Sequence, residues 1–491
     1  MTEPDDSVRS SSSQPPVGAV VILAAGEGTR MKSSRSKLLH ELGGHSMLSY
    51  AIDAATALQP ERIVVVVGHL RDQVEAHLAE VAPHVIVAVQ GSDAYGTGYA
   101  VRCALDVLGD VHGEVVVTYG DVPLLTSETL AGLVADHRRS ASAATVLTAN
   151  VPDPTGYGRV VRDDDGLVGR IVEHKDATTD QLGISEINSG IYVFAAETLV
   201  QGLAEITSDN ASGELYLTDV VTVAGRHGQP VAAHLIDDLW QTEGINDRIQ
   251  LARMNAELNR RTLEKWMRAG VTVIDPATTW VHASVDLAAD VTLHPNTSLE
   301  GATSVGAGAT IGPDTTLVDV EVGEGATVIR THGSLAVIGA GAGVGPFAFL
   351  RPGTQLGEGG KIGTFVETKN AQIGAGAKVP HLSYVGDAVI GENANIGAGV
   401  IFANYDGVTK STSTVGRASF VGSNSVLAAP VNIADGAYVA AGSAVTNDVG
   451  VGELGVSRAR QRNIPGWVVR KRAGTKTAAA AEAAADERLH P

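Results

Sequence analysis

Aromatic residues and cysteine are scarce in this chain. Aromatic side chains make up only 4% of the 491 residues, and Cys103 is the only cysteine. A single cysteine excludes an intrachain disulfide and a cysteine-ligated zinc cluster, and it is typical of a protein of the reducing cytoplasm. Because aromatic residues are few, the core must consist of Val, Ile, Leu and Ala. The 57 glycines indicate many turns, and together these features indicate a repetitive β architecture.

Positively charged residues are outnumbered by negatively charged ones, and long apolar runs are scarce. The formal net charge is -19, which argues against nucleic acid or an anionic membrane as a partner, because proteins that bind these surfaces present a basic face. The segment MTEPDDSVRSSSSQPP lacks the apolar stretch of a signal peptide, and no run of about 18 apolar residues occurs. We expect a cytoplasmic protein that meets any phosphate ligand with a few local cations and a metal ion.

Alternating apolar runs and amphipathic stretches fill the chain from Val17 to about Ile245. The runs AVVILAAG, RIVVVVG, VIVAVQ and EVVVTYGD alternate with SMLSYAIDAATAL, DQVEAHLAEVA and YAVRCALDVL. This pattern predicts a Rossmann-like α/β domain over 17–245, with parallel strands covered on both faces. Ligands of such sheets bind beyond the carboxyl ends of the strands, where LAAGEGTRM and TYGD are expected.

Two further segments follow, since 491 residues exceed the usual size of one core. Residues 246–270 predict one linker helix that ends near Gly270. Its apolar stripe consists of Leu251, Met254, Leu258, Thr262 and Trp266.

From Val271 the hydrophobic period becomes six. Aliphatic residues recur in phase in three runs: Val305, Ile311, Leu317; Ile338, Val344, Leu350, Leu356, Ile362; and Val415, Val421, Leu427, Ile433, Val439, Val445. Small residues follow many of them, as in VGAGATIGPDTT, which is the hexapeptide signature of a parallel β-helix. We predict a left-handed β-helix domain over 271–467 with roughly ten coils.

The two ends are predicted to be disordered, over 1–16 and 468–491. The tail KTAAAAEAAADERLHP is of low complexity, although its alanines would also permit a loose helix.

The segment LAAGEGTRM predicts a phosphate cradle. Ala24, Ala25, Gly26 and Gly28 allow backbone N–H groups to approach a ligand, and the cations Arg30 and Lys37 follow. It is not the dinucleotide fingerprint, because Met31 stands where glycine is required, and no P-loop motif occurs. The alternative is a glycine-rich turn with two solvated cations, and Glu27 adds a negative charge beside any phosphate.

LAAGEGTRM followed by KLLHELGG resembles the sugar-1-phosphate nucleotidyltransferases. The later segments QGSDAYGTGYA, TYGDVPLL, GYGRVV, VEHKDA, INSGIYVF and EGINDRIQLA match one branch in the same order. Together with the hexapeptide repeats, they resemble the bifunctional family that is both N-acetylglucosamine-1-phosphate uridyltransferase and glucosamine-1-phosphate acetyltransferase. The resemblance covers Val17 to Trp467.

This resemblance implies attack of a sugar-phosphate oxygen on the α-phosphate of UTP, with release of pyrophosphate and no covalent enzyme intermediate. It implies that Arg30 and Lys37 are catalytic and contact the triphosphate, and that Asp121 and Asn246 hold Mg²⁺. Without the family, Asp121 would be interpreted as a turn residue and Asn246 as a helix cap. The remaining implied substrate residues are Leu23, Ala24, Ala25, Gly26, Gln90, Gly96, Thr97, Tyr119 and Gly120 for the nucleotide, and Gly156, Glu173 and Asn188 for the sugar.

The β-helix alone could be purely structural. Its repeat slips between Ile362 and Ile373 and between Val379 and Ile390, and the loop ANYDGVTKSTST interrupts it. Polar residues gather near these faults: Arg351, Lys369, His381, Tyr384, Asn395, Asn404 and Tyr405.

The same family places its acetyltransferase on these segments. A neutral glucosamine amine must attack the thioester of acetyl-CoA, and a histidine, with an ordinary pKa of about 6.5, suits the role of base; His381 is the candidate, a satisfied structural histidine the alternative. The resemblance implies that Arg351 and Lys369 bind the sugar phosphate and that Tyr384 and Asn395 bind the sugar. The implied acetyl-CoA residues are Ala398, Asn404, Tyr405, Ser423, Ala441 and Arg458.

Two statements about the second site concern composition and assembly. This half lacks cysteine, which excludes an acyl-cysteine route, and its basic segment RARQRNIPGWVVRKR either is a solvated tail or helps to hold the anionic coenzyme. The family is a homotrimer with acetyltransferase sites shared between neighbouring β-helices, which implies the same here.

The sequence therefore predicts a two-step enzyme that makes UDP-N-acetylglucosamine for the bacterial cell envelope from glucosamine-1-phosphate, acetyl-CoA and UTP. One alternative is a nucleotidyltransferase whose β-helix serves only assembly or regulation. Another is a non-catalytic binding protein with a decayed nucleotidyltransferase fold, against which the intact Lys37, Asp121 and Asn246 argue.

Overall fold

The computed structural model describes residues 16–489, so nearly all of the predicted disordered N-terminus lies outside the described residues. The chain divides into two compact units. Unit 1 extends to Ala269 and includes two later pieces, Trp280–Val285 and Leu299–Gly301, and unit 2 holds the rest.

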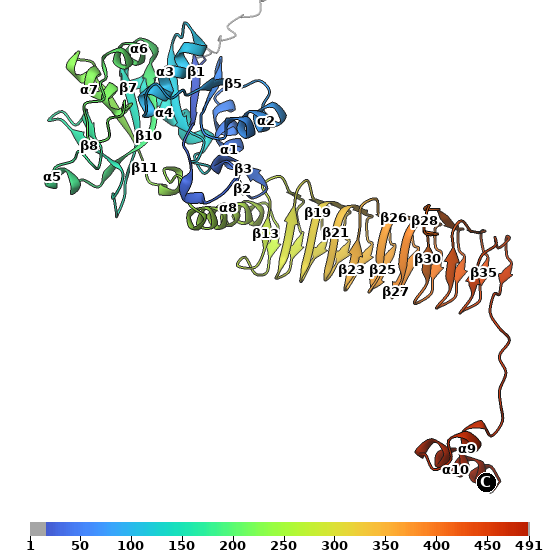
Figure 1. The fold of residues 1–491 in the computed structure, drawn as a ribbon. Helices are drawn as coiled ribbons and strands as arrows, with labels where there is room; N and C mark the ends of the chain where they lie inside the picture. Colours follow the sequence, from blue (N-terminus) through green and yellow to red (C-terminus); the bar gives the residue numbers. More distant parts are fainter. Residues whose placement is uncertain (1–15, 490–491) are drawn as a thin grey trace, which may run out of the picture. The chain divides into compact units, whose positions relative to one another are not determined.

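A mixed β-sheet forms the centre of unit 1 (Figure 1). Its parallel part consists of β1 (Ala19–Ala24), β4 (Ile63–Val67), β5 (Ile86–Val89) and β6 (Glu114–Tyr119), in the spatial order β6-β1-β4-β5. These are the runs that the sequence predicted, and every described side chain of β1 and β4 is buried because the sheet is covered on both faces.

The other side of the sheet departs from the parallel pattern. Strand β10 (Glu186–Ala195) runs antiparallel to β6 and to β7 (Ala144–Asn150), and β11 (Val231–Ile236) closes this edge. The hairpin β8 (Gly158–Arg162) and β9 (Val168–Val172) pairs with the start of β10. The sequence prediction contained no antiparallel strand.

Helices cover both faces. One apolar cluster packs α3, α6 and α7 on the sheet, and the other packs α1, α2 and α4. The bounds of these helices are α1 Met47–Thr56, α2 Arg71–Val81, α3 Thr97–Leu108, α4 Ser127–Ser140, α6 Ala196–Glu205 and α7 Thr218–Arg226. Because an apolar core covers each face of the sheet, the sheet is rigid, and the loops at its edge are held in place.

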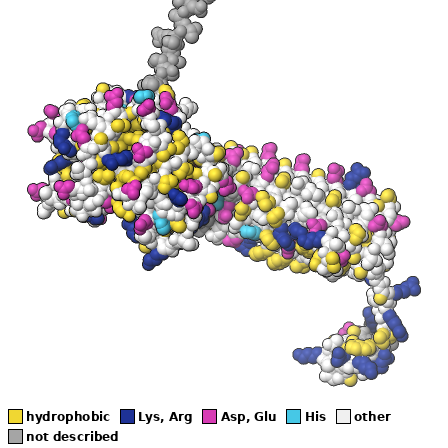
Figure 2. Space-filling model, turned by 45° about the horizontal axis from the view of Figure 1, so that its top comes forward, with side chains coloured by type: hydrophobic (Ala, Val, Ile, Leu, Met, Phe, Trp, Pro, Cys, Tyr) yellow, Lys and Arg dark blue, Asp and Glu magenta, His cyan; other side chains and the backbone are white. Residues whose placement is uncertain are grey.

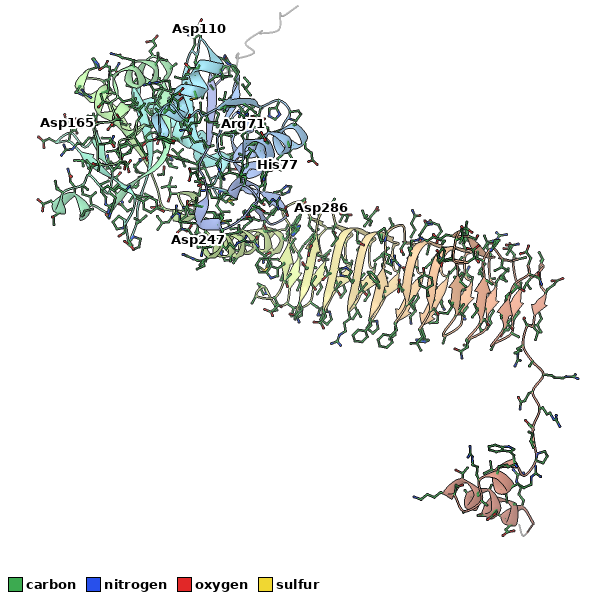
Figure 3. All side chains as sticks on the ribbon, viewed as in Figure 1. Arg71, His77, Asp110, Asp165, Asp247 and Asp286 are labelled. Carbon is green, nitrogen blue, oxygen red and sulfur yellow. The ribbon has the colours of Figure 1, made fainter. Side chains whose placement is uncertain are left out.

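The predicted linker helix is α8 (Arg248–Arg268), which belongs to unit 1. Its apolar stripe packs on a small cluster around Leu42 and Met47, into which Met254 is fully buried. The N-cap is Asp247 and not Asn246, because the Asp247 carboxylate accepts the first free N–H groups of the helix. Figure 3 shows Asp247 at the start of α8.

Unit 2 is a parallel β-helix, as predicted from the six-residue period (Figure 1). Eleven strands from β12 (Thr272–Val273) to β37 (Leu454–Gly455) stack in one parallel sheet. The in-phase aliphatic residues from Val305 to Val445 are all buried. The strands that carry the predicted site are β23 Ala348–Leu350, β25 Lys361–Thr364, β26 Glu367–Ile373, β27 Lys378–His381, β28 Tyr384–Ile390, β29 Asn395–Ile396, β30 Ile401–Ala403, β32 Phe420–Val421 and β35 Tyr438–Val439.

The slips in the repeat are bent strands. Both β26 and β28 run for seven residues across two faces of a coil, and each bends at one residue with positive φ, Asn370 (44°) or Asp387 (48°). Asn and Asp tolerate this left-handed conformation better than other side chains. The Asn370 amide donates to Asp387 Oδ1 at 2.9 Å, which ties consecutive bends together.

The C-terminal tail is helical in the described residues, where we had predicted disorder. Helix α9 (Trp467–Lys471) precedes α10 (Lys476–Leu489). The alanine-rich sequence explains α10, because alanine has the highest helix propensity of all residues. Within residues 16–489, no helix has the length and apolar character needed to cross a membrane.

Replacement of Asp247 by alanine should destabilise unit 1. The substitution removes the acceptor for the N–H groups of Ile249 (2.9 Å) and Gln250 (2.8 Å), a loss of about 1 kcal/mol for a typical N-cap. Thermal unfolding should therefore begin at a lower temperature. Asp165→Ala is the matched control, because Asp165 is an exposed residue of the β8–β9 turn (Figure 3); equal effects of the two substitutions would contradict the capping role.

Candidate active sites

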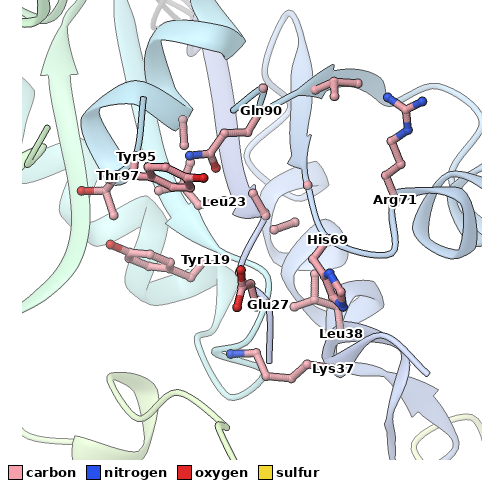
Figure 4. Close-up of a pocket in the computed structure, with 18 of the residues that line it drawn as sticks. Leu23, Glu27, Lys37, Leu38, His69, Arg71, Gln90, Tyr95, Thr97 and Tyr119 are labelled. Carbon is pink, nitrogen blue, oxygen red and sulfur yellow. The ribbon is translucent and has the colours of Figure 1, made fainter. Parts of the chain in front are cut away.

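A pocket of about 740 Å³ opens in unit 1 beyond the carboxyl ends of β1, β4 and β6 (Figure 4). This is where a parallel sheet is expected to bind its ligand. The structure brings ten of the predicted residues together in its lining: Leu23, Ala24, Ala25, Gly26, Lys37, Gln90, Gly96, Thr97, Tyr119 and Asp121.

Two glycines permit the close approaches that shape this pocket. Gly28 has a φ of 61°, and a side chain there would lie 2.8 Å from Lys37 Cβ. Gly96 has a φ of 107°, and a side chain there would lie 2.4 Å from the Leu215 carbonyl oxygen. The first glycine lets the loop after β1 pack on Lys37, and the second lets α3 begin at the pocket wall.

Lys37 connects three distant segments at one end of the pocket. Its ammonium donates to Asp121 Oδ2 at 2.6 Å and to Asn246 Oδ1 at 3.3 Å. The ion pair is largely buried, with side-chain exposures of 10% for Lys37 and 19% for Asp121. Because the Ile245 N–H donates to the Asp121 carbonyl at 2.9 Å, the segment carrying Asn246 is held beside the end of β6.

The oxygen atoms that contact Lys37 would also suit a hard cation. Mg²⁺ is commonly held by one or two carboxylates, with waters and substrate phosphates completing its shell. Asp121 and Asn246 offer one carboxylate and one amide oxygen that already converge on the Lys37 ammonium. Within the described residues, no group of three His, Cys, Asp or Glu side chains is arranged to hold a metal without a substrate.

Arg30 is not part of this arrangement. It is exposed on the short 3₁₀ turn Thr29–Met31 and does not line the pocket. Sequence reasoning also missed lining residues, notably His69, Arg71 and Tyr95 (Figure 4). A signal for His69 was present, since it follows the strand RIVVVVG and therefore lies at the same sheet edge as Asp121.

The residues predicted to bind the sugar lie together on neighbouring strands, outside the pocket lining. Asn188 of β10 pairs with Gly158 of β8, two residues after Gly156. Glu173 follows β9 directly, and the Thr218 hydroxyl donates to its Oε1 at 3.4 Å. We call Gly156, Glu173 and Asn188 the sugar group.

Tyr119 connects the pocket with the sugar group. Burial raises its pKa, and the carboxylates of Asp121 and Glu173 raise it further. Tyr119 therefore lies within electrostatic range of both the prospective metal ligand and the sugar group, and Figure 4 shows its ring at the pocket wall.

In unit 2 four of the six predicted acetyl-CoA residues, namely Ala398, Ser423, Ala441 and Arg458, follow one corner of the β-helix. We call the turn between the eleven-stranded sheet and the next strand of each coil the first corner. The Gly399 N–H donates to the His381 carbonyl at 3.1 Å, Asn424 N–H to that of Ala398 at 2.8 Å and Gly442 N–H to that of Ser423 at 2.8 Å. Ala441 stands in this column, and Arg458 follows it at the next coil.

The predicted phosphate residues lie at the second corner, where β26 and β28 bend. Lys369 Nζ lies 3.6 Å from Asp387 Oδ2, and Arg351 pairs with Glu367 at 2.9 Å. Asn404 is buried and donates to Asp387. Burial raises the pKa of Asp387, but hydrogen bonds from the Asn370 and Asn404 amides and the Lys369 charge outweigh it, so the pKa is lowered.

Sequence reasoning missed Lys410 at this corner. Its pKa is lowered, chiefly by the neighbouring Lys369 ammonium and to a smaller extent by the charge of Arg351. Three cations therefore gather at the second corner, and the signal was the interruption ANYDGVTKSTST itself, whose chain returns through Lys410. Tyr405 is exposed at the start of this loop.

The other predicted residues are distributed over two faces. Tyr384 begins β28 on one sheet and Asn395 lies in β29 on the other, with His381 exposed at the first corner between them. The chain thus presents these groups on an outer surface and does not enclose them.

Replacement of Glu173 by glutamine should stabilise unit 1 at neutral pH. Burial raises the pKa of Glu173, and the carboxylates of Asp176, Asp219 and Glu214 add to the shift. A carboxyl with a raised folded-state pKa destabilises the fold above that pKa and has no effect below its unfolded value of 4.5. The variant should therefore melt at a higher temperature than the parent at pH 7 to 8, and the difference should vanish as pH falls below 4.5. Glu61→Gln, at an exposed site, should show no such pH-dependent gain.

Comparison with known proteins agrees with both halves of the chain. Residues 20–234 match the MobA-like NTP transferase domain. The chain is 56% identical over 476 residues to the bifunctional protein GlmU of Kineococcus radiotolerans, covering 96% of each chain. It is 56% identical over 469 residues to that of Pseudarthrobacter chlorophenolicus, covering 95% of each, and 53% identical over 470 residues to that of Corynebacterium glutamicum, covering 95% of this chain and 97% of the relative. With a nucleotidyltransferase pocket in one unit and a β-helix in the other, this chain belongs to the bifunctional GlmU family.

Proposed function

We propose that the two reactions of this bifunctional enzyme are divided between the units. Unit 1 transfers uridylate from UTP to N-acetylglucosamine-1-phosphate, and unit 2 transfers acetyl from acetyl-CoA to glucosamine-1-phosphate. The observation that carries this division is the placement of Lys37, Asp121 and Asn246 in one unit and of His381, Lys369 and the first-corner column in the other.

For uridyl transfer, unit 1 supplies orientation and charge. A sugar-phosphate oxygen bonds to the α-phosphorus of UTP while the bond to pyrophosphate breaks, and the leaving group takes the electron pair. The backbone of Leu23 to Gly26 borders the nucleotide, and the Gln90 N–H is fixed on the Val67 carbonyl at 2.8 Å. Lys37 provides the positive charge at the phosphate end.

Asp121 and Asn246 would hold Mg²⁺. When bound, Mg²⁺ supplies positive charge that neutralises the phosphates and the departing pyrophosphate. Lys37 would balance the negative charge of Asp121 and of the substrate phosphates from the same end of the pocket. The sugar group orients the nucleophile from the opposite side of Tyr119.

For acetyl transfer, the glucosamine amine nitrogen attacks the thioester carbonyl, and His381 would accept the proton that this amine loses. The C–N bond forms, the C–S bond breaks and coenzyme A leaves as the thiol. The backbone of His381 is fixed, because its carbonyl accepts from Ser383 Oγ at 2.8 Å and from the Gly399 N–H. Lys369, Arg351 and Lys410 would hold the sugar phosphate, while the first-corner column and Arg458 would hold the coenzyme.

We further propose that three copies of the chain assemble through their β-helices in the cytoplasm. A column of large apolar side chains stands exposed at the first corner, with Phe347 50%, Phe365 57% and Leu382 61% accessible. The Phe347 and Phe365 rings stack at 5.2 Å, and Figure 2 shows hydrophobic side chains gathered beside Lys and Arg on the β-helix. An exposed apolar column next to half-exposed site residues fits a site completed by a second copy.

His381→Asn and Asp121→Asn form a reciprocal pair that tests the division. His381→Asn should reduce thiol release from acetyl-CoA by at least about 100-fold, as expected for loss of a general base, with uridyl transfer unchanged. Asp121→Asn should do the reverse and should abolish Mn²⁺ binding in the presence of UTP. Pyrophosphate and thiol release measure the two reactions. Equal loss of both reactions in either folded variant would contradict separate sites.

Phe365→Glu tests the assembly. A carboxylate in the Phe347–Phe365 stack would have to be desolvated in a packed interface, so light scattering should report a mass below that of three chains. Acetyl transfer should fall with the assembly, and uridyl transfer should persist. Leu335→Glu is the matched control, because Leu335 is an apolar residue of similar exposure, 58%, at the second corner. An unchanged trimer in Phe365→Glu would exclude this column from the interface.

A further inference from the structure

Arg159, in the motif GYGRVV, is the largest fully buried side chain in the described residues, with 1% of its surface accessible. Among those residues no carboxylate oxygen lies within 4 Å of its guanidinium, and its Nε has no hydrogen-bond partner. A buried cation without an ion-pair partner is costly, and its replacement by a hydrophobic side chain often stabilises a fold. A role in packing alone therefore does not account for an arginine here.

The guanidinium connects two segments that carry the sugar group. Nη1 donates to the Tyr157 carbonyl, and Nη2 lies 3.4 Å from His174 Nδ1. The Gly156 N–H donates to the same Nδ1 at 3.3 Å. Because Nδ1 receives two N–H donors, the imidazole is held in one orientation with its proton on Nε2.

Strand register places Arg159 at the centre of the sugar group. Arg159 pairs with Ile187 of β10 on one side and with Val172 of β9 on the other. The residues that follow these partners are Asn188 and Glu173, and Gly156 lies three residues before Arg159. The side chain of Arg159 thus joins the turn after Gly156 to the segment that follows Glu173, while its backbone pairs with the strand that carries Asn188.

We propose that Arg159 is a positioning residue for the sugar phosphate, and that it acts by fixing His174 between the Gly156 turn and the end of β9. This inference rests on the proposed uridyl transfer and adds two residues to it. Arg159 does not touch the nucleotide pocket, so its loss should affect the sugar phosphate and leave UTP untouched.

The test is steady-state uridyl transfer by Arg159→Met in the full chain. The KM for N-acetylglucosamine-1-phosphate should rise at least 10-fold while the KM for UTP stays within twofold of the parent. Arg159→Lys should resemble Arg159→Met, because one ammonium cannot make the two directed bonds of a guanidinium. Arg162→Met is the matched control: Arg162 pairs with Glu186 at 2.7 Å and stands at the opposite end of β8 from Gly158, which pairs with Asn188.

Two further measurements separate positioning from plain structural support. In Arg159→Ala, guanidinium at low millimolar concentration should restore the KM for the sugar phosphate, and urea, its neutral analogue, should not. His174→Leu should reproduce the effect of Arg159→Met, and the double variant should be no worse than either single variant, because the two residues act through one contact.

Three outcomes would overturn the inference: equal rises in the KM values for UTP and the sugar phosphate, additive effects of the two variants, or a normal KM in His174→Leu. The last of these remains decisive should Arg159→Met fail to fold. Failure of the parent chain to transfer uridylate would instead overturn the proposed function, so the two failures are distinguishable.

Discussion

The contact of the Lys37 ammonium with Asp121 and Asn246 is the interaction on which the proposed uridyl transfer of unit 1 depends. It joins the loop after β1 to the end of β6, 84 positions later, and to Asn246 just before α8, 209 positions later. The Ile245 N–H also donates to the Asp121 carbonyl, so the chain just before α8 is fixed at the end of β6. Because α8 begins two residues after Asn246, this contact also fixes the start of the helix. A single largely buried cation therefore connects the proposed phosphate end of the pocket with the start of α8.

Local patterns predicted most of this architecture. The Val/Ile runs identified the parallel strands, and their ends identified the sheet edge where Lys37 and Asp121 meet. The direction of β10 could not be predicted, because a strand buried on both faces has the same apolar pattern in either orientation. The resemblance implies that Arg30 contacts the triphosphate with Lys37; Arg30 is exposed on the turn Thr29–Met31, and its contact with the phosphates stays a prediction.

The β-helix shows a different limit. Six-residue periodicity fixed which aliphatic residues are buried, because each coil repeats the same inward position. The bends at Asn370 and Asp387 left a weaker signal, namely Asn and Asp at the slips, where positive φ is required. The burial of Arg159 left no signal in the sequence, since GYGRVV is also compatible with a solvated arginine on an edge strand. Arg159 is buried because its strand pairs with β10 on one side and β9 on the other.

The position of β27 within its stack has a consequence for kinetic robustness. In a solenoid each coil is stabilised chiefly by its two neighbours, so opening begins at the ends and spreads inward. His381 closes the seventh of eleven strands in the stack, and four further strands separate it from the C-terminal end. Fraying there opens β37 and β35, and with them Arg458 and Ala441 of the proposed coenzyme column, before it reaches β27, so coenzyme binding is lost while the proposed base is still in place.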